Sequence, residues 1–536
     1  ALTPAAADVT PSGGGLRLTA DSLLYADSGD SATVATPISD DGTAHTLKKI
    51  GPGVLTVQGA NTYTGTSTLT GGTLVADSTT ALGSGNISFE GGTLRYTSTT
   101  AATDFSAGGR MKNSASAITV DTNGENVTLA GNIDSTNTGG LTKTGAGTLT
   151  LTGTNSFSGN ITMNTGSVVI DGGSSSSPVS FSDNTTMSII NGGTLTASGN
   201  GTFNSDDITM SVIGGGGTST WDLGGNLLST SNTLHDNQNL VIDGQGFAGS
   251  AVVTNVGEIR WGRSNTNSTI TITDGGQMNV TNGDVRLGNP YYIGSPPAGQ
   301  NNTLTIGGGS ATSTFTGSTS RDIYIGYGER AGASGNTVTV STNGVLTSTR
   351  HMYVGHVNNS QNGDYVSTNN QLLVTGGSAD MNQLSVGYAV TADRRANANV
   401  VAVNNGGQLS TGGTAYVGRS QNSGSAANAN TLTVSGTSSQ WDAGNQTVYV
   451  GFANNGAGES NNNILTVDTD GSLINVSSLN VGGGGSGTTT GNQLVLDGGS
   501  VSATTVTVSA GNTLSGNGTI TGNTAIAGTL GIGVDG

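Results

Sequence analysis

Aromatic residues recur at one position of a short signature, where they could stack on a flat ligand. The signature is an apolar residue, a variable residue, an apolar residue and Gly, as in VYVG ending at Gly451. Aromatic faces stack on sugars, so a rigid row of them predicts a site for an extended polysaccharide or for another protein. The alternative is a structural ladder of rings that stabilises a sheet. The variable position holds Tyr324, Tyr353, Ser385, Tyr416 and Tyr449, and the position after the Gly holds Tyr327, His356, Tyr388, Arg419 and Phe452.

Residues suited to catalysis or metal binding are sparse. His351 and His356 flank one strand of the signature, so alternation predicts that they point to opposite faces and make a poor metal pair. Asp468-Thr469-Asp470-Gly471 resembles a fragment of a calcium loop but lacks the further ligands. Carboxylates do not recur as pairs in adjacent copies, as glycoside hydrolysis would require. We predict no catalytic residue, no metal site and no cofactor; calcium suits an acidic secreted chain, but no motif supports it.

A second signature, Asn-x-[Leu/Val]-x-[Val/Ile/Leu], recurs at spacings of 34, 34, 29, 31, 33 and 29 residues. Its Asn precedes an alternating segment, at a turn, where Asn side chains bond to local backbone and tolerate left-handed geometry. Stacked at one corner, these residues would form an amide ladder with a structural role, which we favour over ligand binding. The residues are Asn302, Asn336, Asn370, Asn399, Asn430, Asn463 and Asn492.

These signatures must be positioned by short strands in a repeating unit. A period of about thirty residues, with period-two alternation inside each copy, is typical of one unit stacked on copies of itself. We expect an all-β fold, a right-handed parallel β-helix with coils of about 20–34 residues that pair edge to edge about 4.8 Å apart. Alternation predicts Val448 and Val450 inside with Tyr449 outside. The segments that follow VYVG-type strands vary in length, so one edge should carry the loops.

Composition narrows the function classes. The net charge of −17 argues against binding to nucleic acid, which needs clustered Lys and Arg, and against anionic lipid surfaces. The chain has no Cys, which excludes disulfides and thiolate metal sites, and no apolar run long enough to span a bilayer. Only 32% of its residues are hydrophobic, but Val, Ile and Thr alternate throughout, which favours a thin solenoid over disorder.

One pair of segments carries a family resemblance. Residues 47–76 align without a gap to residues 141–170 and share Lys, Gly-x-Gly, a Leu-Thr strand, Gly, Asn, an aromatic residue, Gly and a further strand. This pattern resembles the passenger-associated transport repeat, also called the autotransporter-associated β-strand repeat, of bacterial surface and secreted proteins. Residues 435–451 and 511–530 are similar to the same superfamily. The resemblance implies a parallel β-helix and export, but not an activity, because such passengers include adhesins, enzymes and matrix proteins.

We expect three segments. Residues 1–46 fit the repeats poorly and are interpreted as an N-terminal cap or interaction arm, because a solenoid end must cover its strand edges. Residues 47–230 are expected to form a β-helix with passenger-associated transport-like repeats. Residues 231–536 are expected to form regular coils of about 31 residues.

The predicted function is structural or adhesive. We expect an extracellular or cell-surface bacterial β-solenoid, not an enzyme, whose partners are further copies of itself, surface glycans or surface proteins. Open strand edges at the ends of a β-helix predict head-to-tail fibres. The alternatives are a glycan-binding adhesin that does not polymerise and a polysaccharide-degrading β-helix enzyme.

Overall fold

The structure is a computed structural model, and it describes residues 9–12, 14–175, 179–181, 185–196, 201–203, 207–214, 217–230, 237–262, 266–288, 299–328, 332–358 and 365–532. It divides into two compact units, which are considered separately. The first comprises residues 1–201, 207–212 and 216–222, and the second comprises residues 202–206, 213–215 and 223–536. Among the described residues the one helix is a short 3₁₀ turn, η1 (Ala107–Gly109), so none of the described helices could cross a membrane.

The first unit is built from short strands that pair with strands of the next coil, almost all in parallel. Its coils advance by about twenty residues, as in the register that aligns Leu47 with Ser67 and Ser67 with Ile87. One small sheet contains β1 (Val9–Ser12), β2 (Gly15–Leu18) and β5 (Ile38–Asp40). A second contains β3 (Ser22–Tyr25), β6 (Leu47–Ile50), β8 (Ser67–Leu69) and β10 (Ile87–Phe89).

The remaining strands of the first unit belong to three longer sheets. One row contains β4 (Ser31–Val34), β7 (Val54–Val57), β9 (Thr73–Ala76), β11 (Thr93–Arg95), β12 (Ile118–Asp121), β14 (Leu141–Thr144), β17 (Ile161–Met163) and β20 (Val179–Phe181). The other strands are β13 (Val127–Leu129), β15 (Thr148–Leu151), β16 (Thr154–Asn155), β18 (Gly166–Asp171), β19 (Ser174–Ser175), β21 (Thr185–Ile190), β22 (Thr194–Thr196) and β25 (Ser219–Asp222). Strands β23 (Gly201–Phe203) and β24 (Thr209–Ile213) lie where the division between the units alternates.

The N-terminal residues form part of this first unit. Strand β1 pairs antiparallel with β2, and β2 pairs parallel with β5. Strands β3 and β4 pair parallel with β6 and β7, so residues 22–34 stack directly on the segment that carries the first repeat. The antiparallel β1 covers one edge of β2, whereas β3 and β4 each lie at the end of their sheet.

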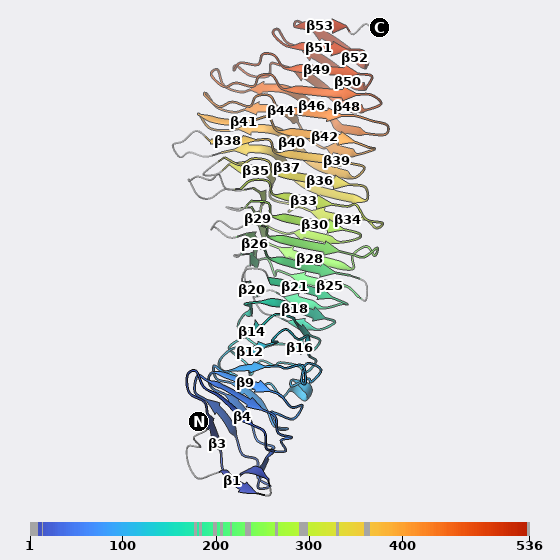
Figure 1. The fold of residues 1–536 in the computed structure, drawn as a ribbon. Helices are drawn as coiled ribbons and strands as arrows, with labels where there is room; N and C mark the ends of the chain where they lie inside the picture. The colour runs from blue at the N-terminus through green and yellow to red at the C-terminus, as the bar shows by residue number, and fades with distance from the viewer. Residues whose placement is uncertain are drawn as a thin grey trace. The chain divides into compact units, whose positions relative to one another are not determined.

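The second unit has two long parallel sheets. Strands of the Asn signature form one, in which each register pair joins equivalent residues of neighbouring coils, as in Thr337 with Gln371 and Gln371 with Val400. Figure 1 shows these strands one above another. They are β27 (Asn239–Asp243), β30 (Thr269–Thr273), β33 (Thr303–Ile306), β36 (Thr337–Ser341), β39 (Gln371–Thr375), β42 (Val400–Asn404), β45 (Thr431–Val434), β47 (Ile464–Asp468), β49 (Gln493–Asp497), β51 (Thr513–Gly516) and β53 (Thr529–Ile532).

The other sheet contains the VYVG-type segments, each at the C-terminal part of its strand or strand pair. Its strands are β26 (Leu227–Thr230), β28 (Ala251–Val256), β29 (Glu258–Trp261), β31 (Gln277–Val280), β32 (Val285–Leu287), β34 (Ser313–Thr316), β35 (Ile323–Gly328), β37 (Gly344–Val357), β40 (Ser378–Ala389), β43 (Gln408–Thr411), β44 (Ala415–Ser420), β46 (Gln440–Ala453), β48 (Ser472–Val481), β50 (Ser500–Val508) and β52 (Thr519–Ile526). A third, two-stranded sheet joins β38 (Tyr365–Thr368) to β41 (Arg394–Asn397).

The predicted parallel β-helix is confirmed, with a wider range of coil lengths than expected. Equivalent residues are 16 apart between Thr513 and Thr529 and 38 apart between Val285 and Ile323. Across the 38-residue spacing the two signature strands keep an unbroken register, in which Val285, Arg286 and Leu287 pair with Ile323, Tyr324 and Ile325. Coil length is therefore set by the connecting segments and not by the strands.

Alternation places the predicted residues as the sequence indicates. Val448 and Val450 are buried and Tyr449 is half-buried on the outward side. Trp261 and Trp441 lie fully inside the second unit. Each buried aliphatic side chain contributes about 1.5–3 kcal/mol, so a narrow core repeated in every coil suffices for a chain that is only 32% hydrophobic.

Candidate functional site

The Asn signature builds a continuous amide ladder inside the second unit. The backbone N–H and the Nδ2 of Asn302 both donate to Oδ1 of Asn336, at 3.1 and 3.0 Å. The same pair of bonds joins each ladder residue to the next, including Asn399 to Asn430 at 3.0 Å for both. From Asn336 to Asn492, each ladder Nδ2 also donates to a second acceptor, such as Ala396 O from Asn430 at 2.9 Å. All seven predicted Asn are fully buried, so their polar atoms are used within the fold.

The ladder is one residue longer than predicted. Asn512 continues it, because the N–H and Nδ2 of Asn492 donate to Asn512 Oδ1 at 3.0 and 2.9 Å. The fifth position of that copy is Gly516 instead of an apolar residue, which is why the signature missed it. The left-handed geometry was also assigned one residue too late: φ is positive at Asn301, Gly335 and Asn369, each preceding a ladder Asn.

The two signatures meet at the Gly that ends each VYVG-type segment. A Cβ on Gly387 would lie 2.2 Å from the side chain of Asn430, and Gly387 has φ +74°. The same relation joins Gly326 to Asn370 and Gly451 to Asn492. Glycine is required there for two reasons: the backbone is left-handed, and the ladder amide occupies the space of a side chain.

This Gly also interrupts the strand alternation, which corrects one prediction. His351 and His356 were expected on opposite faces, but Tyr353 lies 6.0 Å from the His351 ring and 4.9 Å from the His356 ring, so both lie on its side. The left-handed turn at Gly355, φ +77°, returns the following residue to the face of Tyr353. The position after each Gly therefore adds a second row of side chains to the same outward face.

The predicted aromatic residues form stacked columns, which we call the aromatic face. Tyr324 and Tyr353 stack with ring centroids 5.1 Å apart, and Tyr353 stacks on Tyr388 at 5.5 Å. Tyr416 stacks on Tyr449 at 5.4 Å. The remaining members, Tyr327, His356 and Phe452, contact these rings at 4.8–5.3 Å.

The aromatic face is less open than an exposed stripe. Tyr353 is only 7% exposed and His356 only 4%, whereas Tyr324, Tyr388, Tyr416 and the other rings are half-buried. The rings cover one another because neighbouring coils bring them within stacking distance. Burial raises the pKa of Tyr324 and Tyr353 and, together with Arg286 and Arg419, lowers the pKa of His356 to about 3.

A row of ionisable residues, three acidic and one His, lies beside the aromatic face and was missed by sequence reasoning. The residue two positions before the variable position of the signature is Glu258, Asp284, Asp322 and His351 in successive copies. Asp322 accepts hydrogen bonds from the His351 N–H, at 3.2 Å, and from the Tyr324 hydroxyl, at 3.4 Å. Extending the signature by one residue toward the N-terminus would have shown this row.

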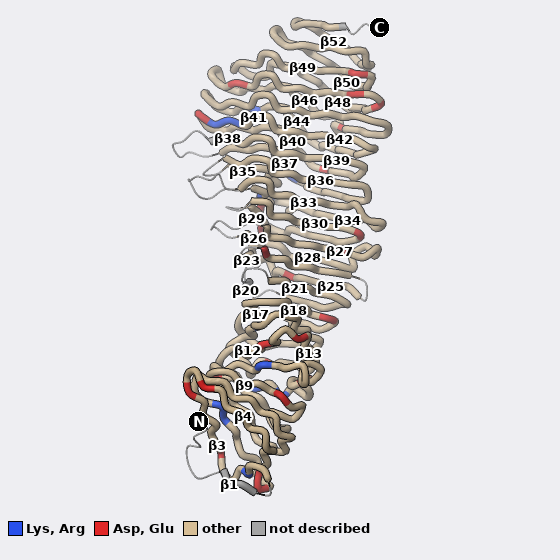
Figure 2. The backbone as a smooth tube through the Cα atoms, viewed as in Figure 1, with Lys and Arg blue, Asp and Glu red and all other residues tan. Residues whose placement is uncertain are grey.

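The arginines of this sheet differ in their partners. Arg260 pairs with Glu258 at 2.8 Å, and Arg286 pairs with Asp284 at 2.8 Å. Arg350 lies 3.6 Å from Asp322. Arg419 has no carboxylate within ion-pair distance among the described residues; its guanidinium carbon lies 4.5 Å from the ring centroids of both Tyr388 and Tyr416. Figure 2 shows how few charges the coils carry, with acidic residues alone near β48 and β50.

The first unit uses a different buried polar device. Lys49 Nζ donates to the carbonyls of Ile50, Gly51 and Gly71 at 2.7–3.1 Å. Lys143, the equivalent residue of the second aligned segment, donates to Thr144, Gly145 and Thr165 at 2.6–3.1 Å. Burial lowers the pKa of Lys143 to about 8.

The Asn shared by the two aligned segments also makes the same contact in both. Asn61 Oδ1 accepts from the Ile38 N–H at 2.8 Å, and Asn155 Oδ1 accepts from the Ile133 N–H at 3.0 Å. The aromatic residues two positions later, Tyr63 and Phe157, are buried. The skeleton shared by the segments is therefore a set of structural contacts between coils.

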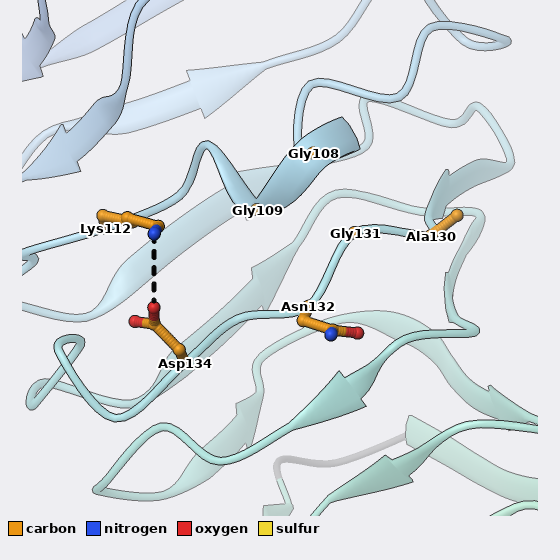
Figure 3. A pocket seen from close by; sticks show the side chains of 7 residues that line it. All are labelled: Gly108, Gly109, Lys112, Ala130, Gly131, Asn132 and Asp134. Carbon is orange, nitrogen blue, oxygen red and sulfur yellow. Dashed lines mark ion pairs between the residues drawn. The ribbon is translucent and has the colours of Figure 1, made fainter.

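An open pocket in the first unit was not predicted either. Figure 3 shows its glycine-lined wall, formed by Gly108, Gly109 and Gly131, and the Lys112–Asp134 ion pair, with Nζ and Oδ2 3.6 Å apart. The two charged groups neutralise each other. The described residues include no group of three or more His, Cys, Asp or Glu that could hold a metal ion.

Comparison with known proteins finds one repeat family in the chain. Residues 47–76 and 141–173 match the family model described as Passenger-associated-transport-repeat. The chain thus carries two repeats of the kind found in autotransporter passengers, on a parallel β-solenoid. No curated protein and no solved structure matches the chain.

Proposed function

We propose that the chain is an extracellular structural and adhesive β-solenoid of a bacterial surface, and that the aromatic face is its contact surface. The observation that carries this proposal is the concentration of rare residues there. The chain has 12 Tyr and 4 His, and the aromatic face takes six of the Tyr and, with the adjoining His351, two of the His. The two passenger-type repeats support export to the bacterial surface.

The half-buried rings support adhesion because they are held rigid before contact. Little side-chain entropy remains to be lost on binding when a ring is already stacked between neighbours. Aromatic residues also dominate the energetics of protein interfaces. A surface contact through Tyr388, Tyr416 and Tyr449 would therefore be stronger than its area alone suggests.

The test is attachment of beads coated with the purified chain to bacterial and epithelial cells. We expect Tyr416→Ala with Tyr449→Ala to abolish most attachment, while Thr433→Ala, on the other long sheet, leaves it unchanged. Circular dichroism checks that both variants are folded. Unchanged attachment by the folded tyrosine variant would restrict the aromatic face to a structural role. Incubation with acidic polysaccharides should release no reducing ends or unsaturated products, as expected for a protein that is not an enzyme.

Head-to-tail assembly into fibres is the second candidate, supported by the last described coil. Ile526 is 37% exposed and Leu530 51%, although their register partners Val508 and Leu514 are buried core residues. A further coil from a second copy would bury both and pair with β52 and β53. Electron microscopy across protein concentrations should show fibres that Ile526→Lys with Leu530→Lys abolishes; single particles at every concentration would exclude this assembly.

A further inference from the structure

We propose that Arg419 is the anion-recognising residue of the aromatic face and that the ligand of this face is a glycan bearing carboxylates. This inference rests on the proposed contact role of the face and names the chemistry of its ligand. It starts from the contrast between arginines on one sheet. Arg286 lies 4.8 Å above Tyr327 and is neutralised by Asp284 at 2.8 Å, whereas Arg419 lies between two Tyr rings and has no carboxylate partner in the described part of the chain.

The two rings fix the guanidinium without using its hydrogen bonds. Contact with both ring faces at 4.5 Å holds the plane of Arg419 between Tyr388 and Tyr416. Nη2 donates to Gln421 Oε1 at 3.5 Å, the limit of hydrogen-bond distance, and Nε is buried with no acceptor among the described residues. A planar guanidinium with unused donors is suited to a carboxylate, which it binds through two parallel N–H bonds.

Even partial burial of an unpaired cation is costly, which makes the half-buried Arg419 informative. Stacking on Tyr faces offsets part of the cost, because the negative face of an aromatic ring attracts a cation. Elsewhere on the same sheet the cost is met by carboxylates at Arg260, Arg286 and Arg350. A carboxylate supplied by a ligand would pair with Arg419, as the chain's own carboxylates pair with the other three arginines.

The rings beside Arg419 indicate what carries the anion. Tyr416 and Tyr449 are stacked and half-buried, in neighbouring coils, so they present ring edges 5.4 Å apart beside the guanidinium. A polymer of sugar rings that bear carboxylates could contact these ring edges and place an acidic group on the guanidinium. The net charge of −17 disfavours non-specific attraction of a polyanion, so binding has to come from these local contacts.

The experiment compares two ligands that differ only in the carboxylate. Fluorescent oligogalacturonate and its methyl ester are titrated against the full chain, and affinities are measured by thermophoresis at two salt concentrations. We expect the acid form to bind at least about tenfold more tightly than the ester, as loss of a charged hydrogen bond predicts. Arg419→Gln should remove that preference and Arg419→Lys should retain only part of it, because Lys lacks the planar fork.

Arg395→Gln is the matched control. It removes the same charge from an exposed residue of β41, in the same unit but in a different sheet, and should leave affinity within about twofold. Near-ultraviolet circular dichroism of the tyrosines and the thermal unfolding temperature check that Arg419→Gln retains its stack. An equal loss in both Gln variants would show a general charge effect and overturn the assignment.

Other outcomes also decide the proposal. Equal affinity for acid and ester, unaffected by Arg419→Gln, would overturn the carboxylate assignment while leaving the contact role intact, because the bead assay tests that role separately. Binding of poly-glutamate but of neither saccharide, lost in Arg419→Gln, would overturn the glycan class in favour of an acidic protein. Failure of every probe to bind would overturn the proposal.

Discussion

The two units join neighbouring coils by different buried polar groups. In the first, Lys49 and Lys143 each close three carbonyls, two in their own coil and one in the next. In the second, each Asn is both donor and acceptor to its neighbours. A Lys ammonium only donates hydrogen bonds, so a single Lys is sufficient where carbonyls converge. An Asn amide both donates and accepts, so Asn side chains bond to one another in series. Such a series requires an Asn in every coil, which explains the regular recurrence of Asn in the sequence.

Disrupting the contact between a signature Gly and its ladder Asn should give the largest loss of stability. Gly387→Ala forces a left-handed φ on Ala, at about 1–2 kcal/mol, and displaces the Asn430 amide, at about 1–3 kcal/mol. We expect a loss of about 4 kcal/mol in the free energy of unfolding, measured with urea by Trp fluorescence. Gly308→Ala is the control, because its φ is also positive but no atom lies within 4 Å of the added Cβ; it should cost about 1 kcal/mol. Equal losses would remove the ladder from the explanation.

Removing one Asn of the amide ladder should give the next largest loss of stability. Asn430→Ala leaves the N–H and Nδ2 of Asn399 without their acceptor, so the free energy of unfolding should fall by about 2–3 kcal/mol in the same assay. Thr433→Ala, on the outward side of the strand that follows, should change it by less than about 0.5 kcal/mol. A similarly small change in both variants would mean that water replaces the amide of Asn430 without a loss of stability.

Acid should weaken the second unit through His356. Its folded pKa, about 3, lies below the ordinary value of 6.5, so the unfolded chain binds more protons between these values. Stability is complete above pH 6.5 and falls by up to about 1.4 kcal/mol per pH unit as pH is lowered toward 3. His356→Gln should flatten this dependence in urea titrations from pH 7 to pH 4.5. An unchanged slope would assign the acid sensitivity to other groups.

Alkali should act, more weakly, on the first unit. The pKa of Lys143 is lowered to about 8 from 10.5, so the cost of holding it charged is complete below pH 8 and is relieved as pH rises toward 10.5. Stability should therefore increase slightly between pH 8 and 9.5. Lys143→Met should remove this increase, as measured by urea unfolding followed by circular dichroism. The same variant is expected to leave the acid sensitivity of His356 intact, since they lie in different units.

Much of the second unit could be predicted from sequence, because its strands repeat. Alternation placed Val448, Val450 and Tyr449 correctly, and the spacing of the Asn signature located the residues that form the ladder. The errors arose at glycines with positive φ. Alternation assumes an extended backbone, and Gly355 breaks it, so His356 was assigned to the wrong face.

Contacts between different coils were harder to predict. Nothing in a single repeat shows that Arg419 contacts Tyr388 as well as Tyr416, since Tyr388 comes from the preceding coil, whose register with β44 depends on loop length. The Lys of the aligned segments was recognised as shared, but its role was not, because three carbonyls converge on it only after the coil closes.

The uneven distribution of cations has a practical consequence. Residues 420–536 contain no Lys or Arg. Trypsin cleaves after these residues alone, so it cannot cut this stretch even when the chain is fully denatured, and standard peptide mapping would recover it only as one very large fragment. Amine-reactive labels meet a similar limit: all four Lys precede residue 144, and two of them, Lys49 and Lys143, are buried. Side-chain labelling of the native protein would thus mark Lys48 and Lys112 and leave the second unit unmodified.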